Sequence, residues 1–552
     1  MKKCNTIYIL SILFSLILSQ NYTLSGFITD SRTGESIPGA NVYLSNTEHG
    51  SSTDIDGYFI LLDIPENNYI LNISYLGYEK IEQIILLENN VNYNFELIIE
   101  PLSIDVITVS EGQLDRKKSF QTSRIKLNTF QLRNIPQLAD ADLFRSLQSL
   151  PGILVQTDFS TGLVIRGGNT DQNLILLDGI TVYNPSHVGG VFSNFILDAV
   201  KEVDLQKGGY NAEYGGRLSS VLKVTSREGN SKEFQGSMSI SALAAQTLLE
   251  GPLKNGAWVI AGRRTYFDQL FKGTDFYFPY FFYDLQGHLY RDINDKQRIS
   301  LSLYRGEDNL KWDDEFGIEA IWRNNTISLN YRVFHSQKLL SNWMLAKSKF
   351  DIFTGLGRNS SDGIVEEDYI DDLTFRTDWT LFLSKENQLN FGFEAKSLDF
   401  NYNATNNGEE LFSLEQKPIE SALYLKNKIL RDQFLIEPGI RLNYYNGLDK
   451  KWYLDPRLQL KYFINDDRYL NISIGQYHQF MSTLQDDFNP SFIDAWFATD
   501  SSVKPGSSQQ ITLGIEQYLK NDIYIQCEGY YKKLNNMLTY VDKNSTVNPS
   551  NE

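Results

Sequence analysis

Within Gln297-Arg-Ile-Ser-Leu-Ser-Leu-Tyr-Arg305, the apolar Ile299, Leu301 and Leu303 alternate with Ser300 and Ser302. Such a period of two predicts a β-strand with one apolar and one polar face. Similar alternation recurs at about fourteen places after residue 234, too regularly for chance strands in a mixed fold. Other clear examples are Thr326–Phe334, Thr374–Leu383, Gln388–Asp399, Leu458–Phe463, Tyr469–Tyr477 and Gln509–Leu519.

The connections between these segments alternate in length. The tight ones are Asp292–Lys296, Ser384–Asn387, Arg431–Asp432, Asn465–Asp467 and Asn521–Asp522. The long ones lie around 265–280, 306–324, 353–368, 403–417 and 479–507. Short turns on one side and long loops on the other are typical of an antiparallel transmembrane β-barrel in an outer membrane. The acidic and aromatic long loops are expected to face outside.

The net charge and the Cys and His residues of the chain argue against several classes of function. The 552-residue chain has a formal net charge of −17, which argues against a nucleic-acid partner because phosphate binding needs clustered Lys and Arg. Only Cys4 and Cys527 are present, and the five His show no paired metal-ligand spacing, so no metal site or cofactor is predicted. The sequence shows no combination of nucleophile, base and orienting residue and no paired-carboxylate site, so it does not predict an enzyme.

The first twenty residues resemble a secretory signal peptide. Lys2 and Lys3 precede an apolar core, Ile7–Leu18, and Ser19 and Gln20 follow it. A spanning helix needs about 20 apolar residues, and the core Ile7–Leu18 is shorter than this. We therefore predict that residues 1–20 are removed and are not kept as a membrane anchor. No later apolar run is long enough for a membrane helix, and a membrane-embedded mature chain would therefore cross as a closed barrel.

Residues 21–101 predict a β-sandwich of short strands separated by turns such as Pro38-Gly39 and Asp54–Gly57. Three stretches, Gly26–Asp30, Ile37–Val42 and Thr53–Phe59, together with Tyr75–Tyr78, resemble the carboxypeptidase-regulatory-like domain. That family name denotes an accessory domain and implies no protease activity. Asp54, Asp56 and Gly57 are interpreted as a turn, since an EF-type calcium loop needs a Glu where Pro65 stands.

A linker, residues 102–124, contains the β-prone segment Ile104, Asp105, Val106, Ile107, Thr108, Val109 and Ser110. It resembles the TonB box, by which receptors recruit a periplasmic coupling protein through strand addition. The alternative is that this segment is the last strand of the sandwich.

Residues 125–228 carry an ordered series of motifs. They are Leu150–Ile153, Ile165–Gly168, Leu176–Ile180 and Lys207–Arg217. The series is similar to the TonB-dependent receptor plug family, which implies an α+β plug. Asp140 is expected to cap a short helix whose apolar residues Leu143, Phe144, Leu147 and Leu150 fall on one face. The resemblance implies that Arg166 and Arg217 contact carboxylates of the barrel wall; the alternative is that they cap local turns. It also implies that Tyr183, Asn184 and His187 lie in a loop near the substrate-facing apex.

The predicted fold is thus mainly β, with a sandwich, a plug and a partial barrel over residues 229–552. Plugged transporters have about 22 strands, so roughly eight strands are expected beyond residue 552. The resemblance implies an outer-membrane receptor whose N-terminal domain is periplasmic. It would bind an extracellular nutrient and take it up with a TonB-like partner. The alternative is a ligand-sensing module that signals without transport.

Overall fold

A computed structural model describes residues 21–100, 120, 123–128, 131–132, 142–155, 162–187, 192–270, 272–275, 277–312, 317–357, 363–483, 495–519 and 523–537. The predicted signal peptide and Ile104–Ser110 lie outside these residues. The sandwich forms one compact unit, and the plug and barrel together form the other. The mainly β architecture predicted from the sequence is confirmed.

The sandwich consists of two four-stranded sheets. One is built from β1 (Asn21–Asp30), β4 (Tyr58–Pro65), β7 (Val91–Asn92) and β8 (Phe95–Leu97), and the other from β2 (Asn41–Leu44), β3 (Gly50–Ser52), β5 (Asn67–Ser74) and β6 (Ile81–Leu87). The chain from Val91 to Leu97 forms two short strands because β7 and β8 pair with different parts of β1. Fourteen buried apolar residues fill the space between the sheets.

The turn before β4 is held by the side chain of Asp54. Its Oδ1 accepts the backbone N–H of Asp56 at 3.0 Å and of Tyr58 at 2.9 Å. Gly57 has a φ of +76°, and an added Cβ would lie 2.5 Å from the carbonyl oxygen of Ile28. Only glycine fits a left-handed backbone at so close an approach. These contacts confirm the predicted turn.

The plug is built on a five-stranded sheet in the order β13-β12-β17-β16-β9. Its strands are β9 (Arg124–Asn128), β12 (Asn173–Leu177), β13 (Ile180–Thr181), β16 (Val200–Gln206) and β17 (Ser220–Ser226). Shorter elements surround this sheet: α4 (Leu143–Gln148), β10 (Ile153–Val155), β11 (Leu163–Ile165), η2 (Thr170–Gln172), β14 (Ser186–His187), β15 (Phe192–Ser193) and η3 (Leu197–Ala199).

The helix α4 begins two residues later than Asp140 would place it. Its N-cap is Asp142, whose side chain accepts the backbone N–H of Arg145 at 3.1 Å. Leu143, Phe144 and Leu147 are buried in the plug core, as their spacing predicted. Aspartate is a favourable N-cap residue at either position. The helix starts after Asp142 because the buried apolar residues fix the position of its first turn.

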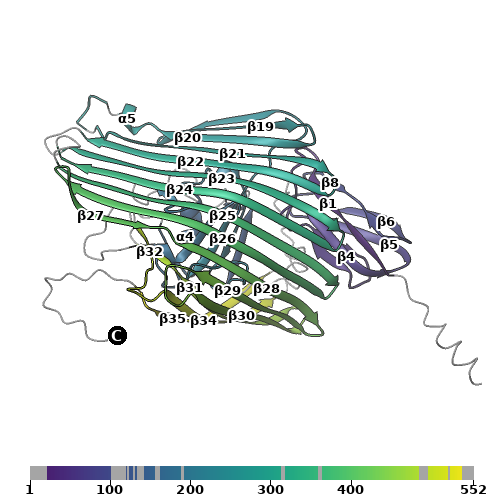
Figure 1. Cartoon of the computed structure of the whole chain (residues 1–552). Coiled ribbons are helices and arrows are strands. Elements are labelled where there is room, and N and C mark those ends of the chain that lie inside the picture. The colour runs from purple at the N-terminus through teal and green to yellow at the C-terminus, as the bar shows by residue number, and fades with distance from the viewer. Residues whose placement is uncertain are drawn as a thin grey trace, which may run out of the picture. The chain divides into compact units, whose positions relative to one another are not determined.

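The barrel wall is a 16-stranded sheet whose long neighbouring strands run side by side in Figure 1. Its strands are β18 (Gln235–Ile240), β19 (Ala244–Leu253), β20 (Gly256–Thr265), β21 (Tyr280–Asn294), β22 (Gln297–Trp312), β23 (Ile318–Ser336), β24 (Leu339–Leu356), β25 (Ile364–Ser384), β26 (Asn387–Asn406), β27 (Glu409–Gln416), β28 (Ile419–Arg431), β29 (Phe434–Tyr445), β30 (Trp452–Asn465), β31 (Arg468–Gln479), β34 (Gly506–Tyr518) and β35 (Tyr524–Asn535). In the described part of the chain, β18 and β35 are the two end strands.

The prediction of long loops is wrong at several places, where the structure has paired strands. The strands β22 and β23 pair as far as Trp312↔Ile318, and β24 and β25 as far as Leu356↔Ile364. The stretch 403–417 forms much of the hairpin β26–β27. Acidic and aromatic residues suggested loops there, but strand pairing continues because backbone hydrogen bonds do not depend on an apolar face.

The barrel wall exposes apolar side chains on its outer face and buries polar side chains on its inner face, the opposite of a soluble protein. On β34 the apolar Ile511, Leu513 and Ile515 are 36%, 54% and 41% exposed, whereas the alternating residues Thr512 and Glu516 are buried toward the plug. An outward apolar face and an inward polar face are expected of a wall surrounded by lipid. Among the described residues, no helix is long and apolar enough to cross a membrane.

Candidate functional site

The interface between the plug and the inner face of the barrel wall is the candidate functional site. It includes four regions of the plug: the turn at Arg166, the glycine-rich loop 207–217, the hairpin β12–β13 and the hairpin β14–β15. Each region contacts the wall mainly through polar groups. The wall supplies them from alternate positions of its strands, which all point inward.

Arg166 lies in a tight turn. Arg166 and Gly167 have φ values of +51° and +73°, and Ile165 and Gly168 bond to each other across them. Two consecutive left-handed residues define a type I′ turn. The turn directs the buried guanidinium of Arg166 to the carboxylate of Glu528 on β35, with which it forms an ion pair. Arg166 Nη1 also donates to Ser123 Oγ at 2.7 Å.

The glycine-rich loop is held through its backbone. Gln459 Nε2 donates to the carbonyl oxygen of Gly209 at 2.5 Å. Arg457 Nη1 donates to the carbonyl oxygens of Tyr210, Asn211 and Tyr214. Both wall side chains lie on β30, at inward positions two residues apart. One guanidinium nitrogen thus meets three carbonyls of the loop.

Glycine is required in this loop where the backbone meets the wall. Gly209 has a φ of +62°, and an added Cβ would lie 2.1 Å from Ser473 Oγ on β31. At Gly215 an added Cβ would lie 2.2 Å from Arg441 Nε on β29. Contacts below about 3 Å are not tolerated between such atoms, so the two glycines allow the backbone to reach the wall.

Glu213 adds an ion pair to the same loop. Its carboxylate contacts the ammonium of Lys426 on β28. Burial alone would raise the pKa of Glu213, but the Lys426 charge outweighs it and lowers this pKa to about 2. Glu213 therefore remains ionised inside the lumen at any ordinary pH.

Arg217 has aromatic neighbours. Its guanidinium carbon lies 5.0 Å from the ring centre of Trp496 and 6.0 Å from that of Tyr183. Trp496 belongs to the hairpin formed by β32 (Met481–Thr483) and β33 (Trp496–Ala498). Within the described residues, Arg217 forms no ion pair, and its Nη1 donates to the carbonyl oxygen of Gly216 at 2.9 Å. It contacts the barrel, but by stacking.

The three residues predicted to contact ligand lie against the wall. Tyr183 donates its hydroxyl to Asp372 on β25 at 2.8 Å and is 1% exposed. Asn184 has a φ of +47°, and its carbonyl oxygen accepts from Asn324 on β23 at 3.1 Å. His187 is buried between Asp284 on β21 and Asp308 on β22. Their role toward a ligand stays a prediction.

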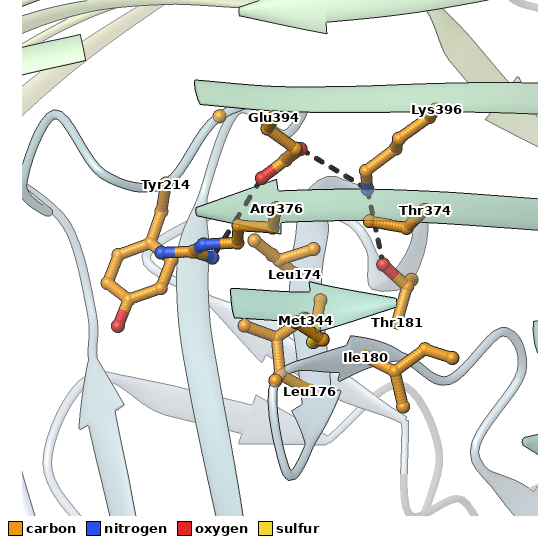
Figure 2. A pocket seen from close by; sticks show the side chains of 12 residues that line it. Leu174, Leu176, Ile180, Thr181, Tyr214, Met344, Thr374, Arg376, Glu394 and Lys396 are labelled. Carbon is orange, nitrogen blue, oxygen red and sulfur yellow. Dashed lines mark hydrogen bonds and ion pairs between the residues drawn. The ribbon is translucent and has the colours of Figure 1, made fainter. Parts of the chain in front are cut away.

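A small cavity separates the hairpin β12–β13 from strands β24–β26 (Figure 2). Lys396 Nζ lies 3.6 Å from Glu394 and 3.4 Å from Thr181 Oγ1 of the plug. Arg376 lies 3.8 Å from the same glutamate, and its guanidinium stacks on Tyr214. The cavity has room for at most about one water molecule, so it is too small for a ligand.

Sequence reasoning missed the wall residues that hold the plug. The signal was present on β30, where Asp455, Arg457, Gln459 and Lys461 occupy every second position and apolar residues or Pro456 lie between them. Polar residues at a period of two mark an inward face. No group of His, Cys, Asp and Glu among the described residues could hold a metal ion.

Family comparisons agree with this arrangement. Residues 245–551 match the family "TonB dependent receptor-like, beta-barrel", which is more than half of the chain. Residues 121–220 match the "TonB-dependent Receptor Plug Domain", and residues 24–109 match the "CarboxypepD_reg-like domain". The chain therefore belongs to the TonB-dependent receptor family, a family of outer-membrane transport receptors.

Two curated relatives show the range of identity. TonB-dependent receptor SusC of Bacteroides thetaiotaomicron is 26% identical over 267 residues, which are 44% of this chain and 26% of the relative. TonB-dependent receptor P3 of Formosa agariphila is 24% identical over 241 residues, which are 40% of this chain and 23% of the relative. The matched region is thus about a quarter of each relative's length.

Solved structures share the fold. The siderophore receptor PirA of Pseudomonas aeruginosa has a TM-score of 0.57 at 15% identity, covering 75% of this chain and 74% of its own. The outer-membrane transporter YddB of Escherichia coli has a TM-score of 0.56 at 12% identity, covering 74% and 69%. Identities this low establish the common fold and nothing about the ligand.

Proposed function

We propose that this protein binds an extracellular nutrient and takes it up across the outer membrane, with energy supplied by a TonB-like periplasmic protein. The sandwich and Ile104–Ser110 lie on the periplasmic side, and the apolar outer face of the wall lies in outer-membrane lipid. The proposal rests on one observation: a folded plug lies against the polar inner face of a β-barrel wall whose outer face is apolar. A ligand passes only if this plug moves.

The contacts that seat the plug suit such a movement. They include side-chain hydrogen bonds and ion pairs, as at Arg457 and Glu213, and small apolar contacts such as that of Ile180 with Met344. None of the described plug strands joins the wall sheet. Separate polar contacts can break one after another and be replaced by water, whereas a continuous strand ladder would have to be torn apart.

The position of β9 supports this coupling. This strand follows the linker directly and is the edge strand of the plug sheet, paired only with β16 among the described strands. A force applied at Ile104–Ser110 would act first on Ser123 and then on β9. Ser123 is held by Glu528 and Arg166, so these two residues resist the pull at the point where it arrives.

Replacement of Thr108 tests the coupling. Strand addition uses backbone N–H groups, and proline has none. We expect Thr108→Pro to abolish uptake while surface binding stays intact, and Thr108→Ser, the matched control, to change neither. Growth on candidate nutrients with and without the gene identifies a ligand for the assay.

Binding and uptake are then measured side by side in cells carrying the full-length gene. Undiminished uptake in a well-expressed proline variant would refute the coupling role of this segment. Saturable binding without uptake in the unaltered protein would instead favour the signalling alternative. Loss of sandwich stability with normal uptake would identify Ile104–Ser110 as the last strand of the sandwich.

A further inference from the structure

His187 is clamped between two strands of the wall. Its Nδ1 lies 2.5 Å from Asp308 Oδ2 on β22, and its Nε2 lies 2.8 Å from Asp284 Oδ1 on β21. The imidazole stacks on Phe282, with ring centres 4.1 Å apart and an angle of 7° between the planes. Carboxylates accept hydrogen bonds, so both ring nitrogens must donate. A histidine that donates twice is the imidazolium cation.

The two carboxylates that face His187 also accept hydrogen bonds from the wall. Asp284 also accepts from Arg263 Nε and Nη2 on β20, at 2.8 and 2.6 Å, and from the hydroxyl of Tyr304 on β22 at 2.6 Å. Asp308 accepts from the hydroxyl of Tyr280 on β21. A neutral imidazole has a single N–H, so loss of the His187 proton would leave one of the two buried carboxylates facing a ring nitrogen that cannot donate to it.

The same cluster reaches the plug helix α4. Arg263 Nη2 donates to the carbonyl oxygen of Ser193 on β15 at 2.6 Å. The N–H and hydroxyl of Ser193 both bond to Asp142, the N-cap of α4, whose carboxylate also acts on Arg263. Strands β14 and β15 form one small hairpin, in which His187 pairs with Phe192. The wall therefore holds both strands of this hairpin.

A second histidine at the interface lacks this arrangement. His288 on β21 lies 3.8 Å from Asp178 of the plug, and the same nitrogen, Nδ1, bonds to Ser302 at 2.9 Å. Among the described residues it pairs with one carboxylate, at a longer distance than either carboxylate at His187. His288 is accordingly a matched comparison for an interfacial histidine without a clamp.

We propose that His187 is a protonated latch, which fixes the hairpin β14–β15 of the plug to wall strands β21 and β22 and releases it when the proton is lost. Burial alone lowers the pKa of His187, but Asp284 and Asp308 outweigh it and raise this pKa to about 9. Because the pKa is raised from 6.5, the latch is fully closed below pH 6.5 and opens as the pH rises through about 9.

The latch is tested without ligand or uptake, so its failure and that of the proposed transport are separate results. A nitroxide spin label is attached at Ser186→Cys in the full-length protein carrying Cys527→Ser, because neighbouring strand residues point to opposite faces and the label avoids the clamp. Its mobility in outer-membrane vesicles is recorded by electron paramagnetic resonance from pH 6 to 10. We expect an immobile label at pH 7 and a mobile one with a midpoint near pH 9.

Four variants assign the midpoint. His187→Gln should give a mobile label at every pH, and Asp308→Asn should move the midpoint down toward 6.5 because one carboxylate is gone. The double variant His187→Gln with Asp308→Asn restores an uncharged amide pair, so the label should be less mobile than in His187→Gln and show no pH transition. His288→Gln should keep the native midpoint. A native label that stays immobile up to pH 10, or a midpoint unmoved by Asp308→Asn, would overturn the latch.

Discussion

Gly209→Ala tests whether the plug needs close contact with the wall. The added Cβ would lie 2.1 Å from Ser473 Oγ and 2.8 Å from Ser473 Cβ. Overpacking of this kind costs about 1–3 kcal/mol, and the left-handed φ of +62° adds about 1 kcal/mol for any residue with a Cβ. A total of about 3 kcal/mol would raise the population of the detached loop more than ~100-fold.

Native-state hydrogen exchange of the amides in 207–217 measures this opening. Gly167→Ala is the matched control, because Gly167 also has a left-handed φ, of +73°, but an added Cβ there meets nothing within 4 Å. Ser473→Gly should rescue Gly209→Ala by about 2 kcal/mol, since it removes the clash and leaves the strain. Equal exchange in Gly209→Ala and Gly167→Ala, or no rescue, would refute the close-contact argument.

Two further predictions concern the plug and the sandwich. Glu213→Gln should destabilise the plug by roughly 3 kcal/mol at pH 7, because its pKa is lowered from 4.5 to about 2; this contribution is complete above pH 4.5 and is lost as the pH falls through 2. Guanidinium unfolding should therefore separate variant and native protein at pH 7 and not at pH 2, and an equal difference at both would contradict the ion-pair account. Asp54→Ala should lower sandwich stability by about 1–2 kcal/mol through loss of two backbone hydrogen bonds, while Asp54→Asn stays near native. Thermal unfolding with and without calcium checks this, and stabilisation by calcium would count against the turn.

Local patterns in the sequence predicted most of the fold. Period-two alternation located wall strands such as β31, since the predicted Tyr469–Tyr477 lies within the observed Arg468–Gln479. The extents of the wall strands were not predictable in this way, because residues beyond the apolar band continue to pair through their backbones. The ladder between β22 and β23 passes through acidic residues such as Glu307 for this reason.

The partners of the site residues were predictable only in part. Arg166 meets a carboxylate of the wall, whereas Arg217 stacks on Trp496, which lies 279 positions later in the chain. Nothing near Arg217 in sequence indicates which side chain a distant hairpin brings to it. The clamp around His187 is of the same kind, since Asp284 and Asp308 come from strands whose register fixes them opposite the plug.

Arg457 binds main-chain oxygens of the glycine-rich loop, and every amino acid carries such an oxygen. This wall residue therefore recognises the path of the loop more than the identity of its side chains. A plug segment from a distant relative could then be transplanted into this barrel, provided that it follows the same path and keeps glycine at 209 and 215. Chimeric receptors built by exchanging whole plugs are a practical use of that tolerance.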